Sequence, residues 1–422
     1  MESNQKNYSL PIAMMFALFF MIAFVTGLPS PMGVIVAKQF GASNFESQLG
    51  FLGNFLAYAF MGIPAGIMLK KYGYKKTALA AIAVGFVGVS VQFLSGQVGS
   101  FTVYLAGAFI SGFSMCMLNT VVNPMLNTLG GGGNKGNQLI QFGGSINSIG
   151  ATITPMLVGW LMGAEAGRTI GKANPALFLA LGIFALAFIV LRFVTIPEPH
   201  LETATERQIK HAHSPLSFRH FILGAIAIFI YVGTEIGIPS TANLFMTASK
   251  NAANAGLGID ATTAGSIVGI YWLLMLVGRL TGGAIGSKVS SKTMLITVSL
   301  LGLVFILAAI FSPITSTITL PVLGTEVPIS IVFLVLCGLC TSIMWGGIFN
   351  LAVEGLGKYT AAASGIFMVM VCGGGIVPLF QGYVSDHFGY LSSYWVMFAC
   401  LGYMLFYGLI GSKNVNKDIP VE

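Results

Sequence analysis

One acidic residue lies deep inside a long apolar stretch of the chain. Glu235 is flanked by the segments IFIYVGT and IGIPSTANLF. An ionised carboxylate in the middle of a membrane helix costs at least about 2.5 to 3.5 kcal/mol, so such residues usually face a cavity and serve transport. A carboxyl group there can exchange a proton or bind a ligand hydroxyl. The alternative is a structural carboxylate bonded to a neighbouring helix. We favour the interpretation that Glu235 faces a cavity and serves transport. Glu235 is then the leading candidate for both substrate binding and ion coupling.

Uncharged amide and hydroxyl side chains recur at helical spacing in two neighbouring apolar segments. Asn119, Asn123 and Asn127 repeat every four residues, so they line one face of a helix. The next segment carries a second polar stripe that consists of Gln138, Gln141, Ser145, Ser148 and Thr152, with Asn147 beside it. Amides and hydroxyls both donate and accept hydrogen bonds, which is what a polyhydroxylated neutral ligand requires.

The alternative role for these polar residues is hydrogen bonding between helices, a common use of polar side chains in membranes. For Asn119, Gln141 and Asn147 the two interpretations are evenly balanced. For Ser148 and Thr152 the packing role is preferred.

Aromatic side chains offer flat apolar surfaces against which the C–H face of a polyhydroxylated ring can stack. Trp345 and Trp272 are the main candidates, with Tyr271 and Phe349 beside them and Asn350 as a polar neighbour of Trp345. Most aromatic residues of membrane proteins instead face lipid, pack in the interior or mark the interfaces.

A further pair, Asn54 and Tyr58, lies one helical turn apart in the second apolar segment and could equally form helix contacts. The predicted substrate-binding set is Asn54, Tyr58, Asn119, Asn123, Gln141, Asn147, Glu235, Trp272, Trp345 and Asn350.

A gating pair is predicted between two charged residues near the ends of apolar segments. Arg279 lies toward the cytoplasmic end of the apolar segment at residues 262–286, the eighth of the chain. Glu354 lies at the matching end of the tenth segment, at residues 328–354. We expect the two to pair and to help close the inner side. The alternative is that Arg279 extends to the lipid headgroups. No basic residue is expected at the centre to neutralise an anionic substrate, which argues against acids and phosphorylated compounds as substrates.

The motifs for enzymatic, metal or cofactor chemistry are incomplete. Gly130 to Gly133 lacks the lysine and the serine or threonine that end a phosphate-binding loop. Cys337 and Cys340 have C-x-x-C spacing, but no second pair or histidine accompanies them, so packing is the preferred role. We expect no enzymatic activity, no metal and no cofactor.

The composition is that of a membrane protein. Hydrophobic residues make up 55% of the 422 residues and charged residues only 8%, whereas about 25% of residues in soluble domains are charged. The apolar runs are about 20 residues long, which indicates helices and not the alternating strands of a barrel. The net charge of +7 is explained by basic cytoplasmic loops, so nucleic-acid binding is not expected.

Twelve segments are long and apolar enough to cross a bilayer. They span residues 11–33, 47–69, 76–95, 101–127, 138–163, 174–196, 217–245, 262–286, 292–312, 328–354, 359–384 and 391–412. The longest polar stretch separates the sixth segment from the seventh. The chain is therefore predicted to be an all-α membrane protein with a six-helix bundle at 1–196, a cytoplasmic linker at 197–216 and a second six-helix bundle at 217–422.

The basic residues predict the orientation. With both termini in the cytoplasm, fifteen of the twenty lysines and arginines lie inside, as the positive-inside rule requires. Lys38, Arg168, Lys172 and Lys250 lie on the outer side, and Arg279 lies within a segment. The first residues, MESNQKNYSL, lack the features of a removable signal peptide, so the first segment is expected to be retained. The expected location is a bacterial inner membrane.

The two halves resemble each other internally. Asn123-Pro-Met-Leu-Asn-Thr-Leu-Gly130 follows the fourth segment, and Asn350-Leu-Ala-Val-Glu-Gly-Leu-Gly357 follows the tenth with the same interval between asparagine and glycine. Repeated halves of a transporter place a substrate site at their interface near the middle of the membrane.

The chain also resembles a known family. The loop GIMLKKYGYKK, from Gly66 to Lys76, is similar to the cytoplasmic signature of the major facilitator superfamily, with Lys70 at its usual acidic position. The stretch GYVSDHFG, which contains Asp386, matches the signature better but is expected on the outer side, so it receives little weight as a gating motif.

More narrowly, the chain resembles the family of fucose/proton symporters and glucose/galactose transporters over nearly its whole length. The segments that carry this resemblance are IPAGI from Ile63, NTVVNP from Asn119, NSIG from Asn147, YVGTE from Tyr231, Gly278-Arg279 and GGGIV from Gly373.

The resemblance implies the major facilitator fold and sugar transport, with departures at two positions. In fucose symporters an aspartate of the first helix and a glutamate of the fourth take part in proton coupling and sugar binding. Ser30 and Asn119 stand at the corresponding positions here. Glu235 instead resembles the glutamate of the glucose/galactose and acetylhexosamine branches.

We therefore expect a monomeric secondary transporter in the lipid bilayer that takes up a small neutral sugar by alternating access, coupled to a proton or sodium ion. The alternatives are a sugar uniporter or exporter without ion coupling, and a nutrient sensor that does not transport. A sensor would need an extended cytoplasmic domain. The sequence leaves open which sugar is carried, which ion is coupled, the direction of transport, the conformational state and the roles of Ser30 and Asn119.

Overall fold

The structure is a computed structural model of the chain. It describes residues 8–29, 32, 35, 39, 41–129, 133–161, 170–198, 213–252, 254–285, 289–320, 324–356, 359–416 and 418–421.

The first half of the chain forms a group of long helices with two short ones. These are α1 (Ser9–Gly27), α3 (Asn44–Ser47), α4 (Leu49–Tyr72), α5 (Tyr74–Val98), α6 (Phe101–Leu129), α7 (Gly133–Leu161), the 3-10 turn Ile170–Ala173 and α8 (Asn174–Phe193). Eighteen or more apolar residues in a row can cross a bilayer only as a helix or a closed barrel, because backbone groups must be paired internally.

The second half repeats this pattern. It contains the 3-10 turn Pro215–Ser217, α9 (Arg219–Thr247), α10 (Ala261–Ile285), α11 (Ser291–Phe311), the antiparallel strands β1 (Thr317–Thr319) and β2 (Glu326–Pro328), α12 (Ile329–Thr341), α13 (Met344–Val353), α14 (Thr360–Met370), α15 (Gly373–Phe388), α16 (Tyr394–Phe406) and the π turn Tyr407–Gly411.

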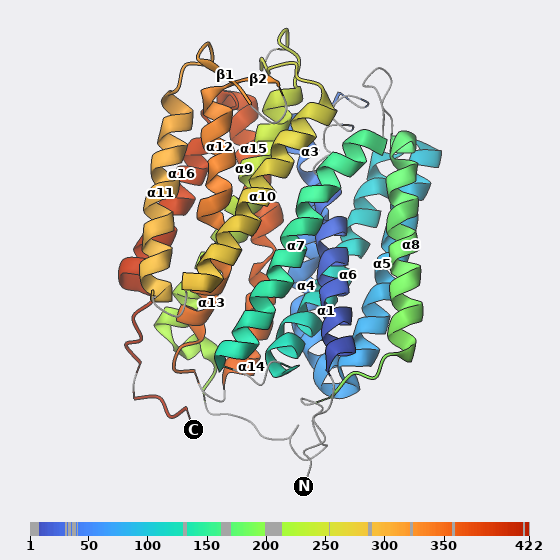
Figure 1. Ribbon diagram of the computed structural model, residues 1–422, viewed down its shortest axis with the longest axis vertical. Helices are drawn as coiled ribbons and strands as arrows, with labels where there is room; N and C mark the ends of the chain where they lie inside the picture. Colours follow the sequence, from blue (N-terminus) through green and yellow to red (C-terminus); the bar gives the residue numbers. More distant parts are fainter. Residues whose placement is uncertain are drawn as a thin grey trace.

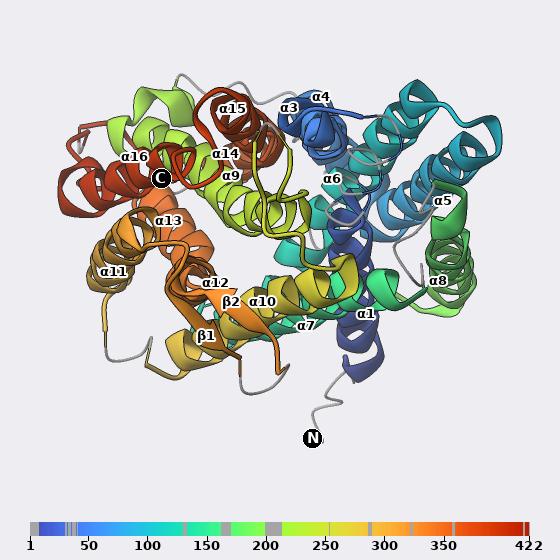
Figure 2. The same cartoon turned by 90° about the horizontal axis from the view of Figure 1, so that it is seen from above.

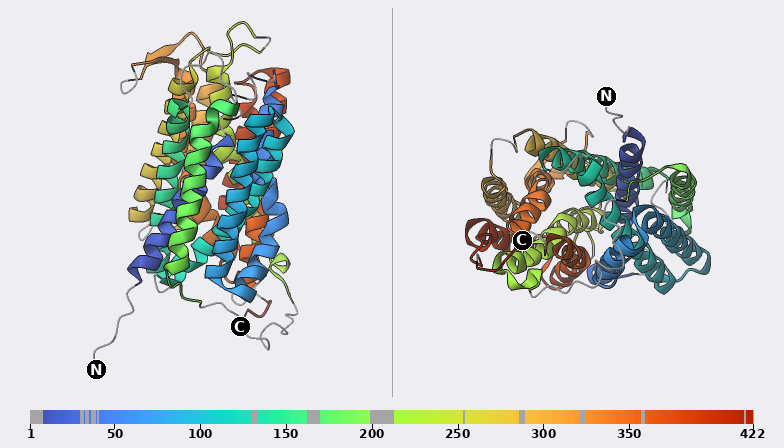
Figure 3. Two further views of the ribbon diagram at one scale, coloured as in Figure 1. Left: turned by 90° about the vertical axis from the view of Figure 1, so that its right-hand side faces the viewer. Right: turned by 90° about the horizontal axis from the view of Figure 1, so that it is seen from below.

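The long helices stand side by side, with α1 to α8 in one group and α9 to α16 in the other (Figure 1). Both ends of the chain emerge at one end of the molecule, which we call the termini face, and β1 and β2 lie at the opposite end, which we call the β face (Figure 3). The groups meet where α7 packs against α10 and where α4 packs against α14 and α15 (Figure 2).

The predicted twelve-span architecture is confirmed. Eleven helical spans of the described chain are long and apolar enough to cross a membrane, with α12 and α13 forming one span and α14 and α15 contributing to another. The twelfth is α7, which has 29 residues and carries the predicted polar stripe. The linker falls mostly outside the described residues, so the exact bundle boundaries remain predictions.

Two spans that the sequence predicts as continuous helices are broken. The tenth span is interrupted at Ser342 and Ile343, between α12 and α13. The Ser342 hydroxyl donates to the Leu339 carbonyl at 2.6 Å, and the Thr341 hydroxyl to the Cys337 carbonyl at 3.2 Å. Such local bonds compete with the regular helix ladder.

The eleventh span breaks at Val371 and Cys372, directly before three glycines. A Cβ atom on Gly373 would lie 1.9 Å from the Phe229 carbonyl oxygen, so only glycine allows this close approach to α9. Periodicity could not reveal either break, because both depend on bonds and contacts of single residues.

A glycine turn joins α4 to α5 at the termini face. Gly73 has φ +84°, and a Cβ atom there would lie 2.3 Å from a Glu198 carboxylate oxygen. That carboxylate accepts the backbone N–H groups of Tyr74 and Lys75, the latter at 3.0 Å, and so satisfies the first turn of α5. The side chain of Lys70, at the usual acidic position of the signature, lies outside the described residues.

Candidate substrate and coupling site

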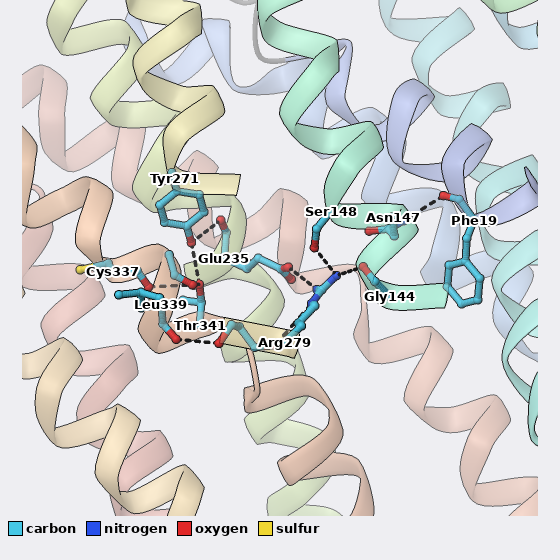
Figure 4. Close-up of polar contacts among 12 residues, drawn as sticks. Phe19, Gly144, Asn147, Ser148, Glu235, Tyr271, Arg279, Cys337, Leu339 and Thr341 are labelled. Carbon is cyan, nitrogen blue, oxygen red and sulfur yellow. Dashed lines mark hydrogen bonds and ion pairs between the residues drawn. The ribbon is translucent and has the colours of Figure 1, made fainter. Parts of the chain in front are cut away.

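The centre of the candidate site is an ion pair between two helices of the second half. Glu235 projects from α9, and its Oε1 lies 3.3 Å from Nη2 of Arg279 on α10 (Figure 4). The two side chains retain small exposed fractions, 13% for Glu235 and 11% for Arg279. The Glu235 side chain is therefore mostly buried, and its carboxylate is paired with a basic group.

Arg279 also binds the first half of the chain. Its Nη1 donates to the Gly144 carbonyl at 2.7 Å and to the Ser148 hydroxyl at 2.8 Å, and both acceptors lie on α7 (Figure 4). Its Nε donates to the Ser342 carbonyl at 3.4 Å, at the break between α12 and α13. A guanidinium presents its donors in a rigid planar fork, so one side chain joins three helices from both halves.

Tyrosines surround the backbone and side chain of Glu235. The Tyr271 hydroxyl donates to the Glu235 carbonyl at 3.1 Å and lies 2.9 Å from the Thr341 hydroxyl. The Tyr231 hydroxyl, one turn before Glu235, lies close to both the Glu235 carboxylate and the Arg279 guanidinium. The ring of Trp345 lies 6.3 Å from that of Tyr231.

The predicted pair of Arg279 with Glu354 is wrong for this structure. Glu354 is exposed at the end of α13, and its carbonyl oxygen lies 2.9 Å from His220 Nε2. Arg279 pairs with Glu235 instead, because an ionised buried carboxylate needs a counter-charge while an exposed one is stabilised by water. The expectation that no basic residue lies centrally is corrected by the same contact.

A second polar cluster lies in the first half. The Asn119 amide donates to the Tyr58 hydroxyl at 2.9 Å and to the Met115 carbonyl at 3.1 Å. Asn123, one turn further along α6, donates to the Asn119 carbonyl at 2.9 Å. Tyr58 is buried while both asparagines are half-buried. No hydrogen bond between described residues joins this cluster to Glu235.

The remaining polar candidates contact neighbouring helices. Asn54 is buried and donates to the Ala108 carbonyl on α6 at 3.4 Å. Asn147 donates to the Phe19 carbonyl on α1 at 3.2 Å. The side chain of Gln141 lies outside the described residues. These contacts favour the interhelical role for Asn54 and Asn147.

The aromatic candidates do not form one surface. Trp272 is half-buried and stands edge-on to Tyr271, with ring centroids 5.2 Å apart. Trp345 is half-buried beside Tyr231, and Asn350 is exposed further along α13. The structure therefore brings Trp345 and Trp272 close to tyrosines that surround Glu235, and it leaves Asn350 outside this group.

Two contributors to the site were missed by sequence reasoning. Ser148 belonged to the polar stripe but was assigned to packing, and Gly144 carries no side-chain signal because it acts through its carbonyl. The stripe itself was the available signal for Ser148.

Comparisons with known proteins agree with this fold. The family model of the Major Facilitator Superfamily matches residues 14–377. A glucose/galactose transporter of Brucella abortus (biovar 1, strain 9-941) is 29% identical over 416 residues, which cover 98% of this chain and 96% of that protein. An L-fucose-proton symporter of Escherichia coli (strain K12) is 23% identical over 410 residues, which cover 92% of this chain and 89% of that protein.

Among solved structures, the crystal structure of the transporter FucP in the outward conformation matches with a TM-score of 0.71 at 20% identity, covering 96% of this chain and 100% of that chain. This likeness shows the shared fold. The relatives are transporters and not enzymes. The chain belongs to the Major Facilitator Superfamily, and the relatives it resembles within that superfamily are named as glucose/galactose and fucose transporters.

Proposed function

We propose that the protein takes up a small neutral sugar by alternating access, coupled to a proton or sodium ion. The observation that carries the proposal is the ion-paired carboxylate of Glu235, held between α9 and α10 at the meeting of the two halves on a side chain that is mostly buried. Intramembrane carboxylates commonly mark ion pathways and proton relays. The relatives named as glucose/galactose and fucose transporters support a sugar as the substrate.

A neutral substrate fits the charges of the site. The guanidinium of Arg279 is already paired with Glu235 and bonded to α7, so it is not available to neutralise an anionic sugar. The amides of Asn119 and Asn123 are half-buried and can donate to and accept from sugar hydroxyls. A sugar acid or phosphosugar would add an unpaired negative charge beside Glu235, which a low-dielectric site disfavours.

The contacts between the halves support a state that is closed at the β face. The Phe45 N–H donates to Asp386 at 2.9 Å, the Gln48 amide to Ser240 at 3.5 Å, and the Thr262 hydroxyl to the Gly159 carbonyl at 3.4 Å. Each of these bonds joins the first half to the second near the β face. The guanidinium of Arg279 adds two more hydrogen bonds between the halves, both to α7.

The termini face is assigned to the cytoplasm. Basic residues gather there at the helix ends, which the positive-inside rule associates with the cytoplasmic side of a bacterial inner membrane. The described ones are Lys71, Lys75, Lys76, Arg192, Arg219, Lys292 and Lys413. With this orientation the β face is external, and the bonds above close the outer side.

The test is uptake by the purified protein in liposomes, with labelled hexoses, an amino sugar and a disaccharide under proton and sodium gradients. We expect accumulation of at least one sugar under one gradient. The Glu235→Gln variant should lose accumulation and retain exchange of that sugar across the membrane. The matched control is Glu326→Gln, which changes a carboxylate on β2 outside the spans and should transport normally.

Two outcomes would contradict the proposal. Failure to accumulate any tested sugar under either gradient would remove sugar symport as the function. The unaltered protein could instead only equilibrate the sugar across the membrane, at a rate that Glu235→Gln leaves unchanged. That result would establish a uniporter.

A further inference from the structure

We infer that Arg279 transmits the protonation state of Glu235 to the contact between the two halves. The inference rests on the proposed function and assigns Arg279 a positioning role beyond that of a counter-charge. In this inference, α7 is the element that responds to the protonation of Glu235, although it carries no charged partner for Arg279.

The donors of the guanidinium are divided between the halves of the chain. Nη2 faces Glu235 on α9, in the same half as Arg279, whereas Nη1 faces Gly144 and Ser148 on α7 in the other half (Figure 4). Because the guanidinium is planar and rigid, it cannot turn toward or away from Glu235 without moving Nη1 relative to α7. The two sets of bonds are therefore mechanically linked.

Among the described residues, Arg279 is the one charged neighbour of Glu235. On α9 itself the facing titratable group is Tyr231. From α10 come Arg279 and Tyr271, and α12 presents Cys337 close to Tyr271. From α7 the facing groups of the site are the uncharged Ser148 and the Gly144 carbonyl.

Protonation of Glu235 would leave the guanidinium as an unpaired charge that is 11% exposed. A charge without a counter-ion in such a place is unfavourable, and it favours a state in which water reaches it. Arg279 lies six residues before Ile285, where α10 ends at the termini face. Water from that face can reach it when α7 and α10 separate there. Protonation thus favours opening of the seam between α7 and α10 toward the termini face, while the β face stays closed.

The experiment measures the width of this seam directly, by pulsed electron paramagnetic resonance with spin labels at Phe142→Cys and Leu280→Cys. Both native side chains are exposed, and they flank Gly144 and Arg279 on α7 and α10. The chain without the two introduced cysteines, treated with the same spin label, gives the background signal from native cysteines. Four of its five cysteines are buried and so shielded from the label. Distances are recorded in lipid over a range of pH, without any sugar.

We expect the longer distance to gain population as the pH falls. Glu235→Gln, which mimics the protonated form, should show the longer distance at every pH. Ser148→Ala should raise the ratio of long to short distances by about tenfold at high pH, the order expected for loss of one hydrogen bond to a charged group. Arg279→Lys keeps the charge without the planar fork, and it should weaken the pH response.

The control is Thr152→Val, one turn beyond Ser148 on α7, where the hydroxyl donates to the Ser148 carbonyl of its own helix at 2.8 Å. It should behave as the unaltered chain. Equal distances for Glu235→Gln and the unaltered protein at all pH values, or an unchanged ratio in Ser148→Ala, would overturn the inference. Because the distances are recorded without sugar, the inference and the proposed function can fail separately. Normal sugar transport without the distance shift would contradict only the inference, and a distance shift without sugar transport would contradict only the proposed function.

Discussion

At the scale of single residues, the structure shows how a membrane interior selects which charges pair. Arg279 had two carboxylates as possible partners, one exposed at a helix end and one buried. It contacts the buried Glu235, because removing a charge from water is tolerated only when a partner and hydrogen bonds replace the lost hydration. The same requirement explains why the remaining donors of Arg279 face carbonyl and hydroxyl oxygens.

Tyr58 offers a test of the second polar cluster. Its hydroxyl accepts a hydrogen bond from Asn119, and Tyr58→Phe leaves that amide bonded only to its own helix. If the cluster orients Asn119 toward the sugar, the KM for uptake should rise about fivefold with kcat unchanged, since one net hydrogen bond contributes about 1 kcal/mol.

The control for this change is Tyr403→Phe, which removes a hydroxyl that donates to the Leu223 carbonyl at 3.2 Å within the second half. It should lower thermal stability slightly and leave KM unaltered. An unchanged KM in Tyr58→Phe would show that the Asn119 cluster serves packing alone.

At the scale of elements, the short helix α3 connects the halves at the β face. Its first turn is stabilised by a capping box of Ser43 and Glu46, and Asp386 at the end of α15 accepts the Phe45 N–H from across the seam. A carboxylate is stabilised at a helix N-terminus by the exposed N–H groups and the helix dipole. The Asp386 stretch, which received little weight as a gating motif from sequence, thus forms a contact between the halves.

We expect Asp386→Asn to weaken closure of the β face. Loss of a charge at a helix N-terminus costs about 0.3 to 1 kcal/mol, so the open population should rise about two- to fivefold. The measurement is the rate at which a water-soluble maleimide modifies a cysteine placed at Ser240, which is 4% exposed at this seam.

Asp260→Asn is the matched control, because Asp260 accepts the Thr263 N–H at 2.9 Å at the start of α10, within one half. This change should leave the modification rate unaltered. If both variants react at the rate of the parent protein, the Asp386 contact does not contribute to closure.

At the scale of the whole molecule, alternating access requires one half to rock over the other. A disulfide across the seam should therefore stop transport. A Cβ atom on Gly159 would lie 3.4 Å from the Thr262 Cα, close enough for Gly159→Cys and Thr262→Cys to form a bond between α7 and α10. Oxidation should abolish uptake in liposomes, and a reductant should restore it.

A disulfide within one half provides the comparison. A Cβ atom on Gly302 would lie 3.5 Å from the Cβ of the native Cys340, so Gly302→Cys can cross-link α11 to α12. Uptake should survive oxidation there, since the second half moves as a unit. Full transport by the oxidised Gly159/Thr262 protein would argue against rocking as the mechanism.

The sequence alone determined the class of fold. The length and hydropathy of a membrane span are local properties, because every span must cover the same apolar thickness. For that reason the twelve spans, the repeated halves and the position of Glu235 within a span could all be predicted. The polar stripe of α7 was also visible, since helical periodicity places its members on one face.

Tertiary structure decided which of these residues meet. The choice of Glu235 by Arg279, the bond from Arg279 to Ser148, and the contact of Asn54 with α6 depend on how each helix is rotated and which helix lies beside it. The breaks at Ser342 and Cys372 likewise depend on single hydrogen bonds and on a close glycine contact. Neighbouring helices set these relations through the packing and pairing of side chains from segments far apart in the chain, and a pattern within one segment does not contain them.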